Sequence, residues 1–527
     1  MKKRNLLWTC LISLLLAATL LPIGSLACTA VYIGRDASDD GTIIIARSND
    51  YPAIWPSRLQ VTDAVQSEPG RTMPVDNGGT VFAAIPADTY HYTSTPLMDT
   101  ALFASGLQQD AAACTNEKGV AMTMSVTAFT NKAALAADPL VKSGLTEYTA
   151  NDLVICQSAS AREAVMVLTG LIDTYGSSEC NIAFIADQQE AWYIEMYSGH
   201  QYAAVKLPSD KVTVIGNEFT MEYLSDYEEA IVSPNLEAIA RDYSFAVYGE
   251  NGELNLLDTY AGDEVIADYS HMRTWVGHLL LSPETTAADY VRSDRYPLSF
   301  SADHPVSLNE VMSVIRNRYE GTVYSPDETG RTDMRVIGTD TALNVHVLQI
   351  DPSLPADMSC VTWGSVGPTI YGVFVPMSNL CASVSESFGR NQPVEEYGRF
   401  DSATYPWFTF KELNTLCVTN MDVLGAPVRA FWAEAEEKMI AGMAQVLREA
   451  AGMEHDAAVD YVTEYCNAMQ EQAFQDGGNI LNSVRWYMSK ICNTMKNGVN
   501  PETHEVLDEL APVAPIILTV TTDGYGI

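Results

Sequence analysis

Positive charge is scarce in this sequence. Its 527 residues include 30 Lys and Arg against 67 Asp and Glu, a formal net charge of −37 at pH 7. A chain this acidic repels the phosphates of nucleic acids and the anionic surfaces of membranes. The composition therefore argues against nucleic acid as a partner, and such acidity is typical of a soluble exported protein.

Several spacings that mark catalytic and metal sites are also absent. No C-x-x-C pair occurs among the ten cysteines, which argues against a zinc ribbon, and there is no G-x-S-x-G, H-E-x-x-H or G-x-x-x-x-G-K-[ST] stretch. His271 and His278 lie seven residues apart, but without a third ligand they predict no metal site. We expect neither a metal nor another cofactor. A papain-like Cys/His pair stays open on spacing alone, although no C-G-[SA]-C-[WY] stretch is present.

Residues 1–27 have the pattern of a secretory signal peptide. Three basic residues open the chain, an apolar run covers residues 6–21, and Ser25 and Ala27 put small side chains at positions −3 and −1 of a cut before Cys28. A membrane anchor is the alternative, but the apolar run is short for a span. We therefore expect export and Cys28 as the mature N-terminus.

The same cut has a second interpretation. A cysteine just after a leader is also where bacterial lipoproteins receive their lipid, although such sites usually carry Leu at −3, where this chain has Ser25. Lipidation would acylate the α-amine of Cys28. A lipid-anchored surface binding protein and an enzyme that uses this amine therefore exclude each other.

Cys28 opens a predicted β-hairpin. Residues 29–34 and 42–47 are β-rich and are separated by a turn-forming stretch that ends in Asp-Gly. Paired antiparallel strands lie about 4.7 to 4.9 Å apart. We expect the second strand to bring Arg47, and Asp50 just past its end, back beside residue 28.

The rest of the chain predicts an α+β protein with its strands and helices in separate layers. Strands are expected at residues 81–85, 119–127, 182–187, 191–197, 201–207, 212–217, 344–350, 359–365 and 370–376. Helices are expected at residues 151–158, 161–175, 307–319, 428–450 and 455–495. Four strands in close succession over residues 182–217 require antiparallel pairing. We expect one large domain over residues 28–400 and a helical C-terminal region over residues 401–527.

An N-terminal cysteine carries its own general base. An α-amine with a pKa of about 7.7 to 8.0 can take the thiol proton directly or through water. The arrangement also needs a carboxylate to orient the amine, a cation to favour the thiolate and donors for an oxyanion. Asp50 and Arg47 are suitable residue types for the first two tasks.

A set of short motifs extends over residues 28–380. They are Cys28-Thr29 after the leader, Asp40-Gly41, Arg47-x-x-Asp50, Asn116-Glu117-x-Gly119-Val120, Gly216-Asn217, Arg316-x-x-Tyr319-Glu320-Gly321-Thr322 and Trp363-Gly364. In these motifs the sequence resembles the cysteine dipeptidases of the N-terminal-nucleophile (Ntn) hydrolase superfamily, relatives of penicillin V acylase and choloylglycine hydrolase. The resemblance implies an Ntn-hydrolase αββα sandwich of antiparallel sheets with a helical C-terminal appendage, and metal-free hydrolysis of dipeptides.

The resemblance also implies roles for individual residues. By position they are Cys28 for the nucleophile, Arg47 and Asp50 for the charged pair beside it, and Asn217 for the asparagine that helps to hold the tetrahedral intermediate. The amidase relatives use a second asparagine in the strand after the Asn-Glu-x-Gly turn, where this chain has Ser-Val-Thr at residues 125–127. Arg273 is a candidate for a further arginine of those relatives.

We therefore expect a secreted or cell-surface dipeptidase, a thiol protease that forms a thioester acyl-enzyme. Its partners would be small peptide substrates and, as an open option, a second copy of the chain. We expect no stable membrane partner unless Cys28 is lipidated. The enzymatic alternative is an amidase or acylase of the same fold that acts on N-acyl compounds.

Overall fold

The computed structural model describes residues 28–51, 53–106, 110–126, 128–262, 268–331, 333–497 and 514–527. The predicted signal peptide, residues 1–27, and Thr127 of the Ser-Val-Thr stretch lie outside these ranges.

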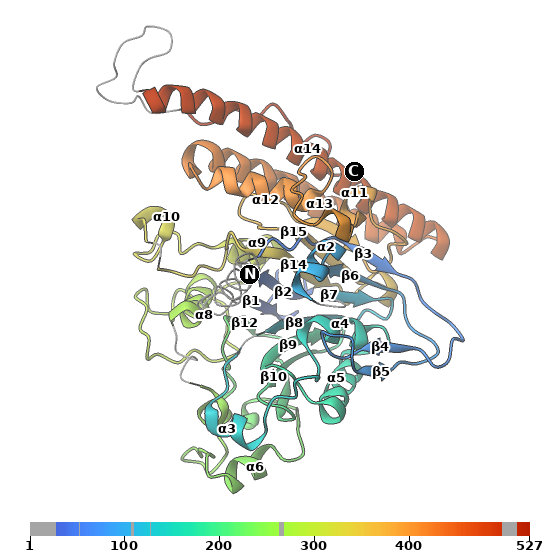
Figure 1. Ribbon diagram of the computed structural model, residues 1–527, viewed down its shortest axis with the longest axis vertical. Coiled ribbons are helices and arrows are strands. Elements are labelled where there is room, and N and C mark those ends of the chain that lie inside the picture. The colour runs from blue at the N-terminus through green and yellow to red at the C-terminus, as the bar shows by residue number, and fades with distance from the viewer. Residues whose placement is uncertain are drawn as a thin grey trace, which may run out of the picture.

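Two antiparallel sheets form the centre of the protein (Figure 1). The six-stranded sheet has the order β12 (Val212–Ile215), β1 (Thr29–Ile33), β2 (Ile43–Asp50), β14 (Ala342–Ile350), β15 (Cys360–Val366) and β16 (Val375–Ser378). The eight-stranded sheet has the order β13 (Ala230–Val232), β11 (Tyr202–Lys206), β10 (Ala191–Met196), β9 (Asn181–Ala186), β8 (Ala121–Val126), β7 (Ala111–Asn116), β6 (Tyr92–Pro96) and β3 (Gln60–Thr62). A separate ribbon pairs β4 (Thr72–Pro74) with β5 (Phe82–Ala84).

Helices cover the outer face of each sheet. The helices on the eight-stranded sheet are α4 (Glu147–Ile155) and α5 (Ala161–Tyr175). Those on the six-stranded sheet are α8 (Asp268–Leu281), α9 (Leu308–Arg316), α12 (Pro406–Cys417), α13 (Ala426–Ala450) and α14 (His455–Asn497). The shorter helices are α2 (Asp99–Ser105), α3 (Lys132–Ala137), α6 (Leu236–Asp242), α7 (Leu256–Tyr260), α10 (Pro326–Thr329) and α11 (Glu386–Gly389).

Side chains that alternate along the strands build one apolar core between each pair of layers. In β1, Val31 and Ile33 pack toward the helices on the six-stranded sheet, whereas Ala30 and Tyr32 pack between the two sheets. A third core lies between the eight-stranded sheet and the helices α4 and α5, and Leu168 belongs to it. The order helix, sheet, sheet, helix confirms the predicted αββα sandwich.

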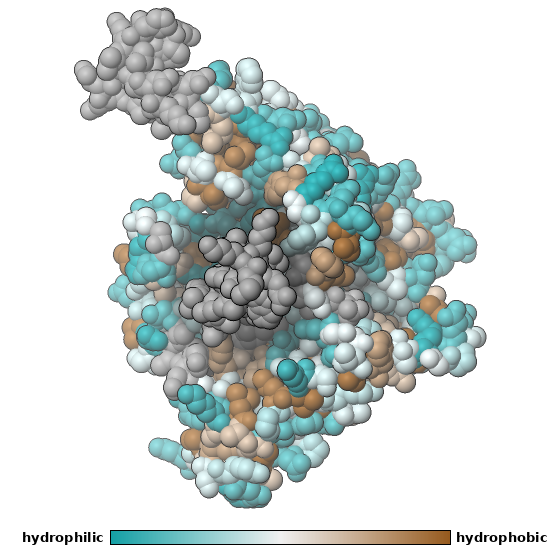
Figure 2. Space-filling view, viewed as in Figure 1, coloured by the Kyte–Doolittle hydropathy of each residue, from teal (hydrophilic) through white to brown (hydrophobic). Residues whose placement is uncertain are grey.

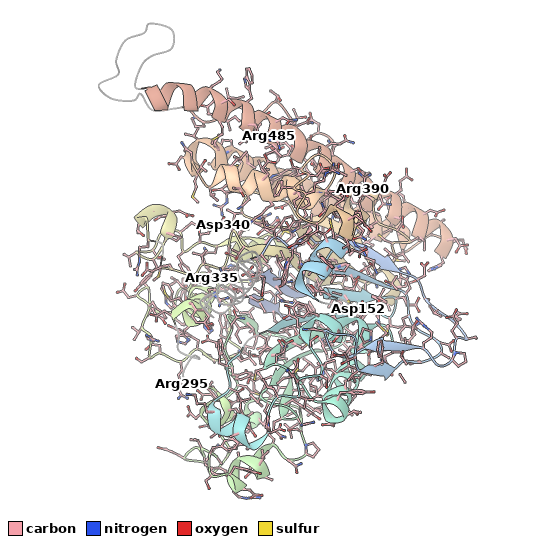
Figure 3. The ribbon with its side chains drawn as sticks, in the orientation of Figure 1. Asp152, Arg295, Arg335, Asp340, Arg390 and Arg485 are labelled. Carbon is pink, nitrogen blue, oxygen red and sulfur yellow. The ribbon has the colours of Figure 1, made fainter. Side chains whose placement is uncertain are left out.

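The C-terminal helices pack into the core of the six-stranded sheet rather than apart from it. Figure 1 shows α13 and α14 side by side across the top of the sheets. Glu436 of α13 is buried and accepts hydrogen bonds of 2.9 and 2.6 Å from the guanidinium of Arg316 in α9. Arg485 of α14, labelled in Figure 3, lies on the outside of the bundle and pairs with Glu412 of α12 at 2.8 and 2.6 Å.

Most predicted elements are confirmed, with four differences. The strand expected at residues 370–376 begins only at Val375 and continues to Ser378 as β16. The hairpin forms as expected, but β2 continues through Asp50, so this residue lies within the strand. The strand at residues 212–217 leaves the other three of its block and pairs with β1 in the six-stranded sheet. Helix α4 begins at Glu147, four residues before the predicted residue 151, and its N-cap residue Thr146 makes no side-chain cap hydrogen bond.

Hydrophilic residues cover most of the face shown in Figure 2, and the hydrophobic residues there form small separate groups. No helix within the described ranges is long and apolar enough to cross a membrane.

Candidate active site

Cys28 lies directly before β1, where the polar end of β2 runs past it. The register pairs Thr29 with Ser48, which puts Asn49 opposite Cys28. Because successive side chains of a strand point to opposite faces, the four polar residues at the end of β2 are divided between two layers. Arg47 and Asn49 face the eight-stranded sheet, and Ser48 and Asp50 face the helices.

Arg47 contacts the sulfur of Cys28. Its Nη2 atom donates to Cys28 Sγ at 3.3 Å and to Asn49 Oδ1 at 3.1 Å, and it forms an ion pair with Glu147, the first residue of α4. Nη1 donates to the carbonyl of Met124 in β8, so both sheets hold the guanidinium. Burial disfavours the charge on Arg47, but Cys28 and Glu147 beside it raise its pKa. The sulfur therefore faces a fixed cation, which favours a thiolate.

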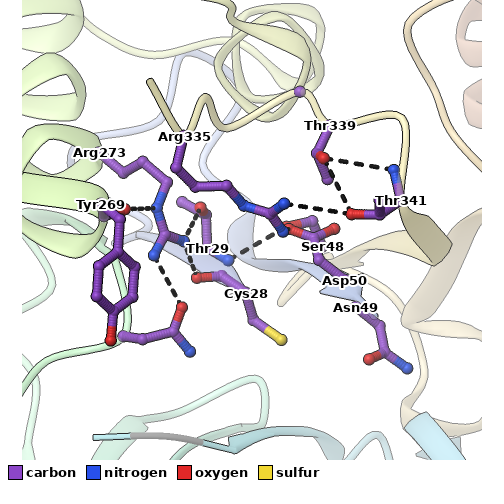
Figure 4. Close-up of polar contacts among 12 residues, drawn as sticks. Cys28, Thr29, Ser48, Asn49, Asp50, Tyr269, Arg273, Arg335, Thr339 and Thr341 are labelled. Atoms are coloured by element: carbon purple, nitrogen blue, oxygen red, sulfur yellow. Dashed lines mark hydrogen bonds and ion pairs between the residues drawn. The ribbon is translucent and has the colours of Figure 1, made fainter. Parts of the chain in front are cut away.

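Asp50 reaches the start of β1 from the other face of the strand. The Thr29 N–H donates to Ser48 Oγ at 3.1 Å, and Ser48 Oγ donates to Asp50 Oδ2 at 3.1 Å (Figure 4). Arg335 forms an ion pair with the same carboxylate oxygen at 3.4 Å. Burial raises the pKa of Asp50 to about 6, and Arg335 opposes that rise. The two charged residues expected beside Cys28 thus lie on opposite sides of β2.

Asn217 follows β12 in a loop that α8 holds in place. Gly216 at the end of β12 lies so close to α8 that an added Cβ would stand 2.5 Å from the carbonyl oxygen of Ser270, which explains the glycine in this motif. The Gly216 N–H donates to Thr274 Oγ1 at 3.1 Å. Arg273 Nη2 donates to Asn217 Oδ1 at 2.8 Å. Because Oδ1 and Nδ2 diverge from one carbon, this bond also fixes the direction in which Asn217 can donate.

Arg273 joins this loop to Cys28. Its Nη1 atom donates to the backbone carbonyl of Cys28 and, at 3.0 Å, to Thr29 Oγ1, while Nε donates to the Tyr269 carbonyl at 2.7 Å (Figure 4). The structure therefore brings Arg273, which the sequence analysis named only as a candidate, into direct contact with Cys28 and Asn217.

The motif at residues 316–322 contacts the site through Tyr319, which bonds the backbone of Arg335. Tyr319 has a φ of 62°, a left-handed conformation that is uncommon for a bulky residue. Its hydroxyl donates to the backbone carbonyl of Arg335 at 2.5 Å. Figure 3 places Arg335 near the middle of the molecule, and Figure 4 shows it reaching toward Asp50. This contact explains why the motif accompanies Cys28 although it lies almost 300 residues away in the sequence.

The histidines near the site have other partners. His271 bonds Glu218 at 3.1 Å and the Asp294 carbonyl at 2.7 Å, and His278 stacks on Phe300 with ring centroids 3.7 Å apart. His346 lies across from Arg47 in β14, but it bonds Thr123 at 2.8 Å, and burial lowers its pKa well below the usual range. Within the described ranges, the hydrogen bond to Cys28 Sγ comes from Arg47 and none comes from a histidine. No papain-like Cys/His pair is formed there.

Sequence reasoning did not find every member of the site. Glu147 and Arg335 carry no local motif, and only their long-range contacts with Arg47 and Asp50 identify them. Tyr319, by contrast, lies in a motif that is visible in the sequence, Arg316-x-x-Tyr319-Glu320-Gly321-Thr322. No group of three His, Cys, Asp or Glu side chains in the described part of the chain is arranged to hold a metal ion.

A family model matches most of the chain. The model is that of peptidase family C69, and it covers residues 27–433. The match begins one residue before Cys28 and includes every site residue named above. These observations place the protein in the class of peptidases. Within that class, the chain belongs to peptidase family C69.

Individual relatives agree with the family match. A probable dipeptidase from Latilactobacillus sakei is 30% identical over 370 residues, which is 69% of this chain and 76% of the relative. A probable dipeptidase B from Streptococcus pyogenes serotype M1 is 27% identical over 421 residues, 77% of this chain and 81% of the relative.

Solved structures with similarity to the chain include two hydrolases. Penicillin V acylase from Agrobacterium tumefaciens aligns with a TM-score of 0.29 and 14% identity over 66% of this chain and 86% of that one. A variant of conjugated bile acid hydrolase from Clostridium perfringens aligns with a TM-score of 0.32 and 10% identity over 69% of this chain and 95% of that one.

Proposed function

We propose that this protein is an exported dipeptidase in which the mature N-terminal residue, Cys28, is the nucleophile. The observation that carries the proposal is the 3.3 Å contact between Arg47 Nη2 and Cys28 Sγ in a chain of peptidase family C69. The names of the relatives, probable dipeptidases, support dipeptides as the substrate.

The first half of the reaction forms a thioester. The Cys28 thiolate, stabilised by Arg47, attacks the carbonyl carbon of the peptide bond, and the carbonyl oxygen becomes an oxyanion. Asn217 Nδ2 and a backbone N–H donate to that oxyanion. The α-ammonium of Cys28 then gives its proton to the departing nitrogen, the C–N bond breaks, and the C-terminal amino acid leaves as a neutral amine.

The second half consumes water. The α-amine of Cys28, now neutral, takes a proton from a water molecule that attacks the thioester carbonyl. The tetrahedral intermediate collapses, the C–S bond breaks, and the N-terminal amino acid leaves as its carboxylic acid, which then gives its carboxyl proton to the solvent. The thiolate and the ammonium are restored for another cycle. In this scheme Asp50, acting through Ser48, orients the terminus that supplies the amine.

The experiment that tests the proposal combines protein sequencing with kinetics. Edman degradation of the exported protein is expected to begin at Cys28, and the Cys28→Ser variant is expected to lose nearly all hydrolysis of a dipeptide panel. Full activity in that variant, a mature chain that begins elsewhere, or a lipid on the α-amine would refute the mechanism. Penicillin V and glycine-conjugated bile acids belong in the same assay, because faster cleavage of either would indicate an amidase instead.

A further inference from the structure

Three carboxyl groups lie on the side of Arg47 that faces away from the helices on the six-stranded sheet. Glu147 pairs with Arg47, and its backbone N–H donates to Glu179 Oε1 at 2.7 Å. Asp110 directly precedes β7, against which α4 packs, and its charge interacts with both Glu147 and Arg47. Burial and Glu147 raise the pKa of Glu179 to about 7 and the pKa of Asp110 well above its usual range.

Asp110 is the unusual member of this group. Its side chain is 2% exposed, and neither carboxyl oxygen has a hydrogen-bond partner in the described part of the chain. Its backbone is held, because the Leu97 N–H donates to the Asp110 carbonyl at 3.2 Å. A buried carboxyl group without a partner is costly, and most such groups in folded proteins are satisfied. The site therefore holds an acceptor that the protein itself does not use.

Two buried donors beside Glu147, Arg47 Nε and Asn49 Nδ2, lack partners in the described part of the chain, but neither bonds Asp110, whose oxygens lack partners as well. Arg47 Nη2 carries two hydrogens but lies within hydrogen-bond distance of three acceptors, on Cys28, Asn49 and Glu147. His346 beside Arg47 adds no charge, because burial lowers its pKa. An alkylammonium group would bring one positive charge and three N–H donors.

The distances suit one particular ammonium group. In a peptide, the α-nitrogen of the first residue lies about 2.5 Å from its own carbonyl carbon. A thiolate poised to attack lies about 3 to 3.5 Å from that carbon, so the α-nitrogen stays within roughly 6 Å of the sulfur. A single atom, Arg47 Nη2, separates the sulfur of Cys28 from the carboxylate of Glu147. The carboxylate of Glu147 therefore lies about as far from the sulfur as the α-ammonium group of a bound substrate would lie.

We propose that Asp110, together with Glu147, binds the α-ammonium group of the substrate and restricts hydrolysis to peptides with a free amino terminus. This inference rests on the proposed function and deepens it. An N-acylated substrate carries no charge at that position and would leave Asp110 unpaired. Binding of the substrate ammonium by Asp110 and Glu147 would therefore distinguish a dipeptidase from an amidase that acts on N-acyl compounds.

The test compares two substrates of nearly equal shape. Alanyl-leucine carries the ammonium group, and lactoyl-leucine has a neutral hydroxyl in its place with the same scissile bond. The unmodified mature protein is expected to favour alanyl-leucine by at least about 100-fold in kcat/KM, because the neutral analogue leaves a buried acceptor unpaired. Asp110→Asn is expected to lower kcat/KM for alanyl-leucine by about 10- to 100-fold, mainly through KM, and to change lactoyl-leucine cleavage less than about threefold.

Asp173→Asn is the matched control. This residue is an exposed aspartate on α5 whose carboxylate contacts Tyr202 at 3.2 Å, and we expect the variant to keep the full preference. Equal cleavage of both substrates by the unmodified protein, or an equal loss for both in Asp110→Asn, would overturn the inference.

A binding measurement keeps this test separate from the proposed mechanism. Calorimetry on the Cys28→Ser variant is expected to detect alanyl-leucine and to find lactoyl-leucine at least about tenfold weaker. Loss of that difference would overturn the ammonium site. The same difference in a protein that hydrolyses neither compound would support the ammonium site and overturn the proposed hydrolysis.

Discussion

Arg273 donates to the amide oxygen of Asn217 at 2.8 Å, and the other terminal nitrogen of the same guanidinium donates to the backbone carbonyl of Cys28. One planar group therefore fixes the proposed nucleophile and the proposed oxyanion donor relative to each other, although 189 residues separate them in the sequence. An ammonium group cannot replace this arrangement, because it is a point charge without the planar fork of a guanidinium.

Arg273→Lys is expected to lower kcat by about 10- to 100-fold and to change KM less than about threefold, because it misplaces a donor that acts in the transition state. Steady-state kinetics with a dipeptide would measure both constants. The double variant Arg273→Lys with Asn217→Ala should be little slower than Asn217→Ala alone, because positioning has no value once the donor is gone. Fully additive losses would contradict the positioning role.

Asn217→Ala removes the proposed oxyanion donor itself. Loss of one such donor typically costs about 10² to 10³ in kcat, and we expect a loss of that size with a nearly unchanged dissociation constant for substrate. Asn251→Ala, in an exposed turn, is the control and should behave like the unmodified protein. Normal turnover by Asn217→Ala would rule out its role.

Arg47→Gln removes the cation beside Cys28 while keeping a side chain of similar length. The thiolate loses its nearest positive charge, so the rate of alkylation by iodoacetamide at pH 7 is expected to fall by about tenfold or more. The alkylated residue would be identified by peptide mass mapping. Arg35→Gln changes the same charge on an exposed side chain and should leave the rate unaltered. An unchanged rate in Arg47→Gln would show that this cation does not tune the sulfur.

The local part of this site could be read from the sequence, because strand alternation and a short hairpin place Cys28, Arg47 and Asp50 within one pair of strands. The same alternation puts Arg47 and Asp50 on opposite faces, which follows from their odd spacing of three residues along β2. The residues from other layers that contact these side chains could not be predicted from the sequence. Glu147 meets Arg47 only after α4 packs on the second sheet, and no spacing rule links residues 100 positions apart.

The layers themselves were predictable from the grouping of strands and helices, but the assignment of one strand was not. β12 follows β11 after a short polar turn, as a hairpin partner would, yet it pairs with β1. Val214 and Ile215 can pack in either sheet by hydropathy alone, and in the structure Gly216 allows the end of β12 to lie close to α8. That pairing brings Asn217 within reach of Arg273, which also bonds the proposed nucleophile, Cys28.

The raised pKa of Asp50 leads us to predict that kcat/KM depends on pH. Burial raises the pKa of Asp50 from 3.8 to about 6, so the carboxylate gains a proton as the pH falls through 6 and loses the charge that attracts Ser48 and Arg335. We expect log kcat/KM to fall below about pH 6 for this reason. The Asp50→Asn variant should be slower at every pH and should lack that inflection. A profile of unchanged shape in Asp50→Asn would assign the inflection to another group.

The contact of Glu436 in α13 with Arg316 in α9 is expected to contribute to the stability of the protein. Glu436 is 3% exposed, accepts both bonds from Arg316, and takes a further 2.8 Å bond from the Phe374 N–H. Glu436→Ala leaves the partly buried Arg316 guanidinium without its carboxylate, with the Thr369 and Gly372 carbonyls as its remaining partners, and leaves the Phe374 N–H unpaired. Breaking a buried pair in this way costs about 3 to 5 kcal/mol of unfolding free energy. Glu412→Ala breaks the exposed pair with Arg485 and should cost at most about 1 kcal/mol. Equilibrium urea unfolding of the two variants, followed by tryptophan fluorescence, would compare these losses, and equal losses would show that the buried pair does not hold α13 to the sheet.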